Sequence, residues 1–272
     1  MNAISPGHLA VITGGASGIG RAAGKAFAAR SMKVALIDQD PQVEATAKDI
    51  GGEAAGFVCD VSDHAAMQAL AARIQAKFGT PPSLVLNNAG IHGGADALSR
   101  AEIWDRTLAV NLFGVLNGVQ AFVPAMIAGG QPGLVINTGS KQGITQPPGN
   151  TAYNVSKSGV KALTEGLAHS LREQTGGRVT AHLLIPGFTH TGMTGGGEKP
   201  AAAWTPEQVV DFMLESLARG DFYILCPDND VTRSMDEKRM AWHMGDVIAN
   251  RPALSRWHPD YKDAFAAFMA KD

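Results

Sequence analysis

Short runs of β-branched and other apolar residues alternate along this chain with alanine-rich segments of helical character. The expected strands are residues 9–13, 33–38, 56–60, 83–87, 133–137, 179–185 and 221–226. The expected helices cover residues near 18–30, 41–50, 63–78, 100–128, 152–175 and 205–219. This alternation predicts a single doubly wound α/β domain, with a seven-stranded, mainly parallel sheet and helices on both faces.

Composition excludes several classes of partner. With 272 residues and 45% hydrophobic content, the chain can bury a large core. Its net charge is −2 and no run of lysine or arginine stands out, so we expect neither nucleic acid nor a membrane surface as partner. A small molecule is therefore the expected partner. The first residues lack a basic region followed by a long apolar stretch, which leads us to expect a cytoplasmic protein.

Cysteine and histidine usage argues against disulfides and metal. Cys59 and Cys226 are the two cysteines, each inside a strand-like segment, so both are expected to be reduced and buried. The eight histidines are scattered without the spacing of metal ligands, and no metal site is expected.

The alternation of strands and helices stops after Cys226. We therefore expect a main domain over residues 1–228 and a C-terminal extension, mainly helical, over residues 229–272. Phe265, Phe268 and Met269 lie at helical spacing, and such an apolar stripe is costly to leave in water. The extension is expected to pack on the domain or on a neighbouring subunit.

A glycine-rich segment joins the first strand to the first helix. Gly14, Gly15, Gly18 and Gly20 follow a strand that ends near Thr13. Glycines at such a turn let the backbone approach a ligand closely, and the amides at the helix N-terminus can hold a pyrophosphate. A dinucleotide is the ligand that this arrangement favours.

Asp38 favours NAD as that dinucleotide. It ends the second strand, 18 residues beyond Gly20, close to the spacing at which a carboxylate reaches the adenosine ribose. The carboxylate would accept hydrogen bonds from the ribose hydroxyls and repel a 2′-phosphate. Ser17 and Gln39 offer no cation to hold that phosphate, so NADP is the less favoured cofactor.

Tyr153 and Lys157 stand four residues apart in the segment "TAYNVSKSG", which is expected to be helical. Positions i and i+4 share one face of a helix, so the ammonium lies beside the phenol. A free phenol has a pKa near 10, too high for a base at neutral pH, and both the ammonium and the charge of oxidised nicotinamide favour phenolate. Tyr153 is therefore the candidate acid and base, and Ser140 is the candidate for stabilising charge on the reacting oxygen.

Six short motifs, in order and spacing, resemble those of the short-chain dehydrogenase/reductase family. They are "TGGASGIG" (13–20), "NNAG" (87–90), "VNLFG" (110–114), "INTGS" (136–140), "YNVSK" (153–157) and "PGFTHT" (186–191). The resemblance covers about residues 8–226 and implies an NAD(P)-binding Rossmann fold. The chain departs from the family pattern at Gly139, at Lys141 and in the aromatic extension after the last strand.

The resemblance also implies roles for individual residues. The implied catalytic residues are Asn111, Ser140, Tyr153 and Lys157. The implied cofactor-binding residues are Gly14, Ser17, Gly18, Ile19, Gly20, Asp38, Asp60, Val61, Asn87, Ala89, Gly90, Tyr153, Lys157, Pro186, Gly187, Thr189 and Thr191. The family usually pairs the helices near 100–128 and 152–175 across a two-fold axis, which implies a homodimer or homotetramer.

The expected substrate pocket is mainly apolar. Its candidate residues are His92, Gln142, Ile144, Phe188 and Met193, together with His190 and Trp204. Lys141 and Lys199 are expected to be solvated, so nothing marks a carboxylate or phosphate on the substrate. We expect an NAD-dependent oxidoreductase that interconverts a secondary alcohol and a ketone, the substrate being apolar or aromatic.

Two other functions stay open at this point. A dehydratase or epimerase on the same fold would need a further acid or base, for which His92 and His190 are the candidates. A non-catalytic nucleotide-binding protein is disfavoured because Ser140, Tyr153 and Lys157 are all present, and binding alone requires no activated phenol.

Overall fold

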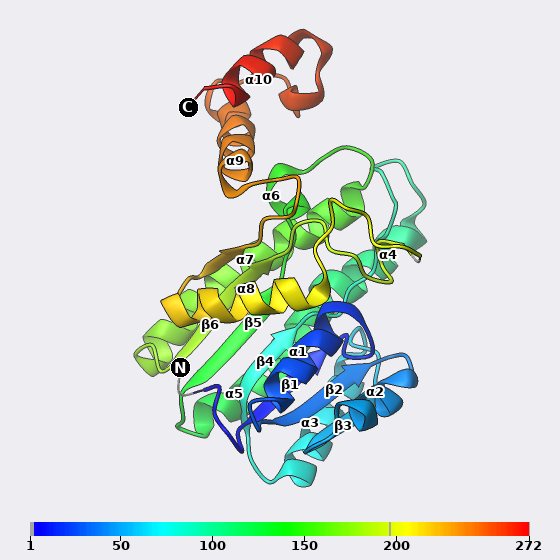
Figure 1. Cartoon of the computed structure of the whole chain (residues 1–272), viewed down its shortest axis with the longest axis vertical. Coiled ribbons are helices and arrows are strands. Elements are labelled where there is room, and N and C mark those ends of the chain that lie inside the picture. Colours follow the sequence, from blue (N-terminus) through cyan, green and yellow to red (C-terminus); the bar gives the residue numbers. More distant parts are fainter. Residues whose placement is uncertain (1–2, 196, 272) are drawn as a thin grey trace.

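One sheet organises the chain, as the alternation predicts (Figure 1). The computed structural model describes residues 3–195 and 197–271, and within them the strands form a seven-stranded sheet in the order β3-β2-β1-β4-β5-β6-β7, parallel throughout. Its strands are β1 (Leu9–Thr13), β2 (Lys33–Asp38), β3 (Ala54–Val58), β4 (Pro82–Asn87), β5 (Gly133–Thr138), β6 (Val179–Ile185) and β7 (Tyr223–Leu225). The predicted doubly wound α/β fold is confirmed, although β3 lies two residues earlier than expected and β7 is shorter.

Helices cover both faces of the sheet. One face carries α1 (Gly18–Ala28), α2 (Gln42–Ile50) and α8 (Pro206–Arg219). The other carries α3 (His64–Phe78), α5 (Gly114–Ala128) and α7 (Thr151–Thr175). Successive strand residues serve opposite faces, so that Ile12 packs with Phe27 of α1, and Val11 with Phe122 of α5. The strands are continuously apolar because both faces are covered.

The helix expected over residues 100–128 is interrupted. It consists of α4 (Ala101–Leu108), a π-helical turn η1 (Ala109–Phe113) and α5. A single π turn inside a helix adds a residue to the turn and often occurs at functional sites. Asn111 lies in this turn and is fully buried.

The same helical stretch is apolar. Residues Ala101–Ala128 have a mean hydropathy of 1.5 and are long enough to cross a membrane by length and composition, but half of that apolar segment is buried inside the protein. A helix that packs on the core of an α/β domain has these properties without any membrane.

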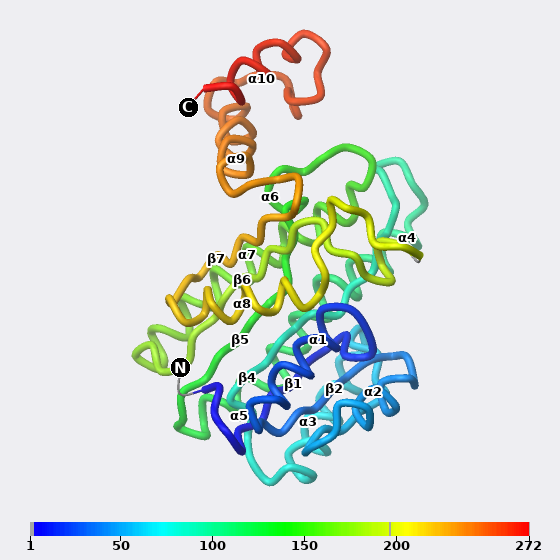
Figure 2. Tube along the Cα trace, viewed as in Figure 1, coloured from blue at the N-terminus to red at the C-terminus, as the bar shows by residue number. Residues whose placement is uncertain are grey.

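The extension after β7 leaves the sheet and does not return to it (Figure 2). It contains α9 (Arg233–Ile248), the short 3₁₀ turns η2 (Ser255–Trp257) and η3 (Pro259–Tyr261), and α10 (Lys262–Met269). The rings of Phe265 and Phe268 lie 5.3 and 5.2 Å from that of Trp242, which is 5% exposed. Two residues of the apolar stripe thus pack on the extension's own tryptophan, and all three residues of the stripe are half-buried.

A polar cluster joins the two halves of the extension. Asp246 accepts hydrogen bonds from the side chain of Arg251 and from the hydroxyl and amide of Ser255. That hydroxyl accepts one from the indole of Trp242. The extension is therefore a small folded unit, and the start of α9 attaches it to the domain beside the short helix α6 (Gln142–Thr145).

Candidate active site

A cavity of about 1200 Å³ opens along the carboxyl ends of the strands. In open α/β sheets this edge is where ligands bind. It is lined by most of the predicted residues: Gly14, Ser17, Gly18, Ile19, Asp38, Asp60, Val61, Ala89, Gly90, His92, Ser140, Gln142, Tyr153, Lys157, Pro186, Gly187, Phe188, Thr189, Thr191 and Met193. The other predicted residues are not among those that line it: Gly15, Gly20, Asn87, Asn111, Ile144, His190 and Trp204.

The glycine loop is shaped by close backbone approach. Gly14 has a φ of +69°, and a Cβ there would lie 2.9 Å from the Cα of Ala89. A Cβ on Gly20 would overlap the carbonyl oxygen of Gly14. Gly20 therefore does not face the cavity. Because it has no Cβ, the first turn of α1 can pack directly against the backbone of the loop at Gly14.

The N-terminus of α1 fits a pyrophosphate. Ser17 is the N-cap residue, but its side chain accepts no hydrogen bond from the helix, and the first turn has no acidic residue. The amides of this turn are therefore uncapped by side chains beside the cavity, where the helix dipole favours an anion.

Asp38 lines the cavity, and both of its carboxylate oxygens accept hydrogen bonds. The amide of Ala16 donates to Oδ2 over 3.1 Å, and the amide of Asp40 donates to Oδ1 over 3.1 Å. The cations among the described lining residues are Lys141 and Lys157. Lys157 bonds the carbonyl of Thr138 at the end of β5, and Lys141 pairs with Asp236 of the extension. Asp38 therefore has no cationic neighbour in the cavity wall.

Tyr153, Lys157 and Ser140 meet at the other end of the cavity. Lys157 Nζ lies 5.8 Å from the centre of the Tyr153 ring and donates to the carbonyl of Thr138 over 2.8 Å. Burial lowers the pKa of Lys157 to about 8. Burial raises the pKa of Tyr153, and the hydrogen bond with Ser140 opposes that rise. Burial thus favours the protonated form of Tyr153, and positive charge close to the ring would favour its phenolate form.

Asn111 positions a wall segment. Its Oδ1 accepts from the amide of Ile91 over 2.7 Å, and its Nδ2 donates to the Ile91 carbonyl over 2.9 Å and to Ser156 Oγ over 3.3 Å. Asn87 is equally buried, and its Nδ2 donates to Asn137 Oδ1. Both side chains connect strands, helix and wall behind the cavity surface.

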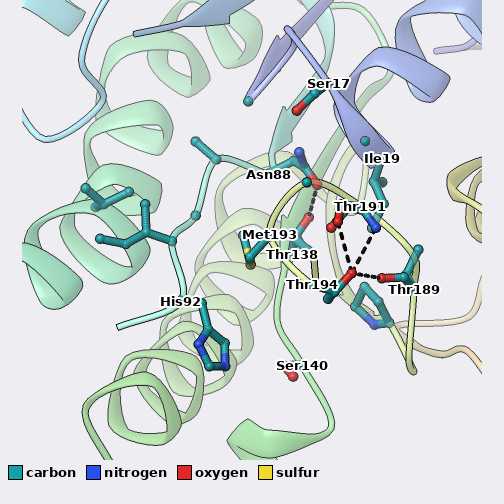
Figure 3. A pocket seen from close by; sticks show the side chains of 18 of the residues that line it. Ser17, Ile19, Asn88, His92, Thr138, Ser140, Thr189, Thr191, Met193 and Thr194 are labelled. Carbon is teal, nitrogen blue, oxygen red and sulfur yellow. Dashed lines mark hydrogen bonds between the residues drawn. The ribbon is translucent and has the colours of Figure 1, made fainter. Parts of the chain in front are cut away.

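Four of the residues expected to meet the substrate line the cavity: His92, Gln142, Phe188 and Met193. Figure 3 shows His92 and Met193 in its wall. The His92 ring lies 5.6 Å from that of Tyr153, and its Nε2 is 3.1 Å from the amide nitrogen of Asn150. Ile144, expected here, instead packs in an apolar cluster. That cluster includes Met240 of α9, a partner distant in sequence.

The segment 191–204 contains four glycines and a proline, which predict a mobile loop, and its residues 191–195 line the cavity. Thr194 Oγ1 donates to the carbonyls of Thr189 and Thr191 and accepts from the Thr191 amide over 2.9 Å (Figure 3). Residue 196, in the middle of the predicted loop, lies outside the described residues. The threonines give this wall a local hydrogen-bond framework.

Sequence reasoning missed several lining residues. They are Cys59, Asn88, Ile91, Val110, Thr138, Gly139, Gly192, Thr194 and Gly195. Most adjoin a predicted residue, so adjacency to a motif was the available signal. Cys59 is half-buried rather than buried, and both cysteines are free. Lys141, expected to be solvated, lines the cavity and is paired with two carboxylates.

In residues 3–195 and 197–271, no group of three or more His, Cys, Asp or Glu side chains is placed to hold a metal ion. The site is instead built from a glycine loop, a strand-end carboxylate and a tyrosine–lysine pair. This combination defines a nucleotide-dependent oxidoreductase.

The sequence places the chain in a family. The family model described as "short chain dehydrogenase" matches residues 8–201. The chain belongs to the short-chain dehydrogenase/reductase family, and it is an NAD(P)-dependent dehydrogenase acting on CH–OH groups.

Two curated relatives have names that give different substrates. A human (3R)-3-hydroxyacyl-CoA dehydrogenase is 34% identical over 224 residues, which cover 78% of this chain and 82% of the relative. A galactitol 2-dehydrogenase (L-tagatose-forming) of Cereibacter sphaeroides is 37% identical, and the match covers 69% of this chain and 74% of the relative.

Two similar solved structures contain different cofactors. A short-chain dehydrogenase/reductase from Burkholderia phymatum, in complex with NAD, has a TM-score of 0.83 and 31% identity over 92% of this chain and 97% of that one. A metagenomic short-chain oxidoreductase in complex with NADP has a TM-score of 0.69 and 29% identity over 82% of this chain and 98% of that one.

The burial of Lys157 predicts a pH dependence of stability. Its pKa is about 8 in the folded protein, against 10.5 for an unperturbed lysine, so between these values the unfolded chain binds more protons and stability rises with pH. In nucleotide-free protein, the unfolding free energy of wild type relative to Lys157→Met should rise by on the order of 1–2 kcal/mol between about pH 7 and 9.5. Urea unfolding at each pH measures it.

Lys161→Met is the matched control, because this lysine is on the same helix but its side chain is 37% exposed and its ammonium pairs with Glu165 at the surface. Its difference from wild type should not follow the same trend. A Lys157→Met difference that stays constant, or falls with pH, would contradict the stated burial of the ammonium.

Proposed function

We propose that this protein is an NAD-dependent dehydrogenase or reductase that interconverts an apolar or aromatic secondary alcohol and its ketone, with Tyr153 as acid and base. One observation carries the proposal. Tyr153, Lys157 and Ser140 meet in the same cavity that has the glycine loop and Asp38 at its other end.

The residues present fit a nicotinamide dinucleotide. The uncapped first turn of α1 suits the pyrophosphate, and Asp38 suits the adenosine ribose. Lys157 and the segment around Thr191 would hold the nicotinamide half. When bound, the cofactor accepts or supplies the hydride.

The chain's own groups handle the proton. In alcohol oxidation Tyr153 takes the hydroxyl proton, and in ketone reduction it returns that proton to the same oxygen. Ser140 donates a hydrogen bond to this oxygen and stabilises its developing negative charge. Lys157 stabilises the phenolate form of Tyr153, which burial alone disfavours.

NAD is the proposed cofactor because of the charge around Asp38. A 2′-phosphate would meet this carboxylate, and the wall beside it consists of uncharged groups such as Ser17 and Gln39. The repulsion between the phosphate and the carboxylate, in a site with little water, would weaken the binding of NADP.

The proposed substrate class follows from the lining of the pocket. Phe188, Met193 and Ile91 supply apolar surface, whereas His92 and Gln142 supply a few polar groups. Lys141 is paired with carboxylates and so does not attract an anionic substrate. The substrates in the names of the two relatives differ, so this lining is the better guide.

We also propose a homodimer or homotetramer. Phe113 and Val155, on the helical stretch 101–128 and on α7, are 51% and 44% exposed. Apolar side chains exposed on neighbouring helices suit a subunit contact, and closed two-fold symmetry is the commonest arrangement.

Replacing Tyr153 by phenylalanine tests the proposed chemistry. Tyr153→Phe removes the proton carrier and keeps the ring, so kcat should fall by roughly 10²–10⁴, while NADH affinity, measured by fluorescence, changes little. Tyr223→Phe is the control, because Tyr223 lies on β7 and bonds Glu165 away from the cavity. Near-normal turnover by a folded Tyr153→Phe protein would refute the assignment.

Cofactor choice has its own test in Asp38→Asn. Asparagine can still accept the Ala16 amide but loses the charge, so the ratio of kcat/KM for NAD over NADP should fall about ten-fold or more. Asp40→Asn, two residues on and exposed, is the control and should keep the ratio. A wild-type protein that already prefers NADP would show that Asp38 has been misinterpreted.

A further inference from the structure

Lys141 lies between the active site and the C-terminal extension. It directly follows Ser140 and lines the cavity, and its side chain is 17% exposed. Its Nζ is 2.6 Å from Asp236 Oδ2, in the first turn of α9, and 3.3 Å from Asp228 Oδ2, in the segment before that helix. The two carboxylates are 7% and 5% exposed, so the ion pairs are nearly excluded from water.

Asp228 extends the connection to the substrate side of the cavity. Its Oδ2 also accepts from the amide of Phe188 over 3.1 Å, and its Oδ1 accepts from the amide of Val231 over 2.7 Å. Burial alone would raise the pKa of Asp228, but the Phe188 amide and the Lys141 ammonium outweigh it and lower the pKa. The Lys141 ammonium thus links the segment after β5 to α9, and through Asp228 it also links the segment after β6.

Gly187 shows how closely these groups approach one another. A Cβ at this position would lie 2.8 Å from Asp228 Oδ2, 2.9 Å from the Pro227 carbonyl and 3.0 Å from Lys141 Nζ. Glycine is required here because the end of β6, the lysine and the start of the extension share this space. The arrangement is a packed junction and not a surface ion pair.

The extension is folded on itself, so its packing fixes the position of α9 at this junction. Asp236 is on the same helix as Trp242, whose ring is packed by Phe265 and Phe268. Met240, one turn after Asp236, packs in the cluster that also holds Ile144 of α6. An ion pair and an apolar contact therefore hold α9 against the segment that begins at Ser140.

We propose that Lys141 is a positioning residue. Its ion pairs with Asp228 and Asp236 hold Ser140 and Phe188 in place against the substrate. The C-terminal extension, which supplies Asp236, is thereby a determinant of substrate binding. This inference rests on the proposed function, in which Ser140 and Phe188 meet the substrate. Removing the charge of Asp236 leaves the buried ammonium with one of its two carboxylates, so Lys141 and the backbone beside it must shift to compensate. A shift of this kind weakens substrate binding and leaves the distant pyrophosphate site unchanged.

The test compares Asp236→Asn with Glu237→Gln. Both remove one negative charge from the first turns of α9, but Glu237 is exposed and pairs with Arg233 on the surface. In Asp236→Asn, kcat/KM for a panel of apolar and aromatic ketones should fall about ten-fold, mostly through KM, with the dissociation constant of NADH within about two-fold of wild type. Glu237→Gln should keep wild-type values.

A double-mutant cycle then shows whether the effect passes through the lysine. In a Lys141→Met background, Asp236→Asn should cause no further rise in KM, whereas Lys141→Arg should retain much of the wild-type kcat/KM. An equal effect of Asp236→Asn in both backgrounds would contradict the proposal. So would unchanged kinetics in Asp236→Asn, a fall in kcat alone, or a parallel loss of NADH affinity.

Amide hydrogen exchange separates this inference from the proposed function. If the wild-type protein turns over no alcohol or ketone of the panel, the proposed function is wrong, and the junction is still tested by exchange in residues 140–145 and 186–190. Asp236→Asn should speed exchange there about ten-fold, and Glu237→Gln should not. Equal exchange in the two variants would refute the junction.

Discussion

The site depends on the burial of one ammonium group. Lys157 is 3% exposed, and its Nζ is held by the carbonyl of Thr138 at the end of β5. An ammonium is costly to remove from water, so the fold must fix its neighbours closely. The helix α7 places Tyr153 on the same face, and the sheet places the cofactor cavity beside both. The fold therefore holds this ammonium 5.8 Å from the centre of the phenol ring.

Much of the fold could be predicted because it depends on local pattern. Strands with both faces covered are continuously apolar, and crossover helices must follow them, so the alternation indicated all seven strands. The glycine loop, Asp38 and the tyrosine–lysine pair were accessible for the same reason, since each needs a residue type at a fixed spacing along one element.

What could not be predicted depends on contacts between residues distant in sequence. The sequence around Lys141 does not indicate its ion pair with Asp236, 95 positions later. Nor does it indicate that Ile144 packs in a cluster with Met240 of the extension. The π turn at Asn111 was not expected because no glycine or proline marks its residues, and the bond of Asn111 to Ile91 joins it to a segment 20 positions away. The extension's self-packing on Trp242 was equally invisible.

An ultraviolet titration of the Tyr153 phenolate tests most directly whether fixed positive charge makes this phenol a base. The chain has three tyrosines, so a Tyr223→Phe/Tyr261→Phe protein contains Tyr153 alone. Burial should keep the pKa of Tyr153 above that of a free phenol in nucleotide-free protein, and bound NAD⁺, together with Lys157, should bring it below the free value. A pKa that stays raised with NAD⁺ bound would show that Tyr153 is not the base.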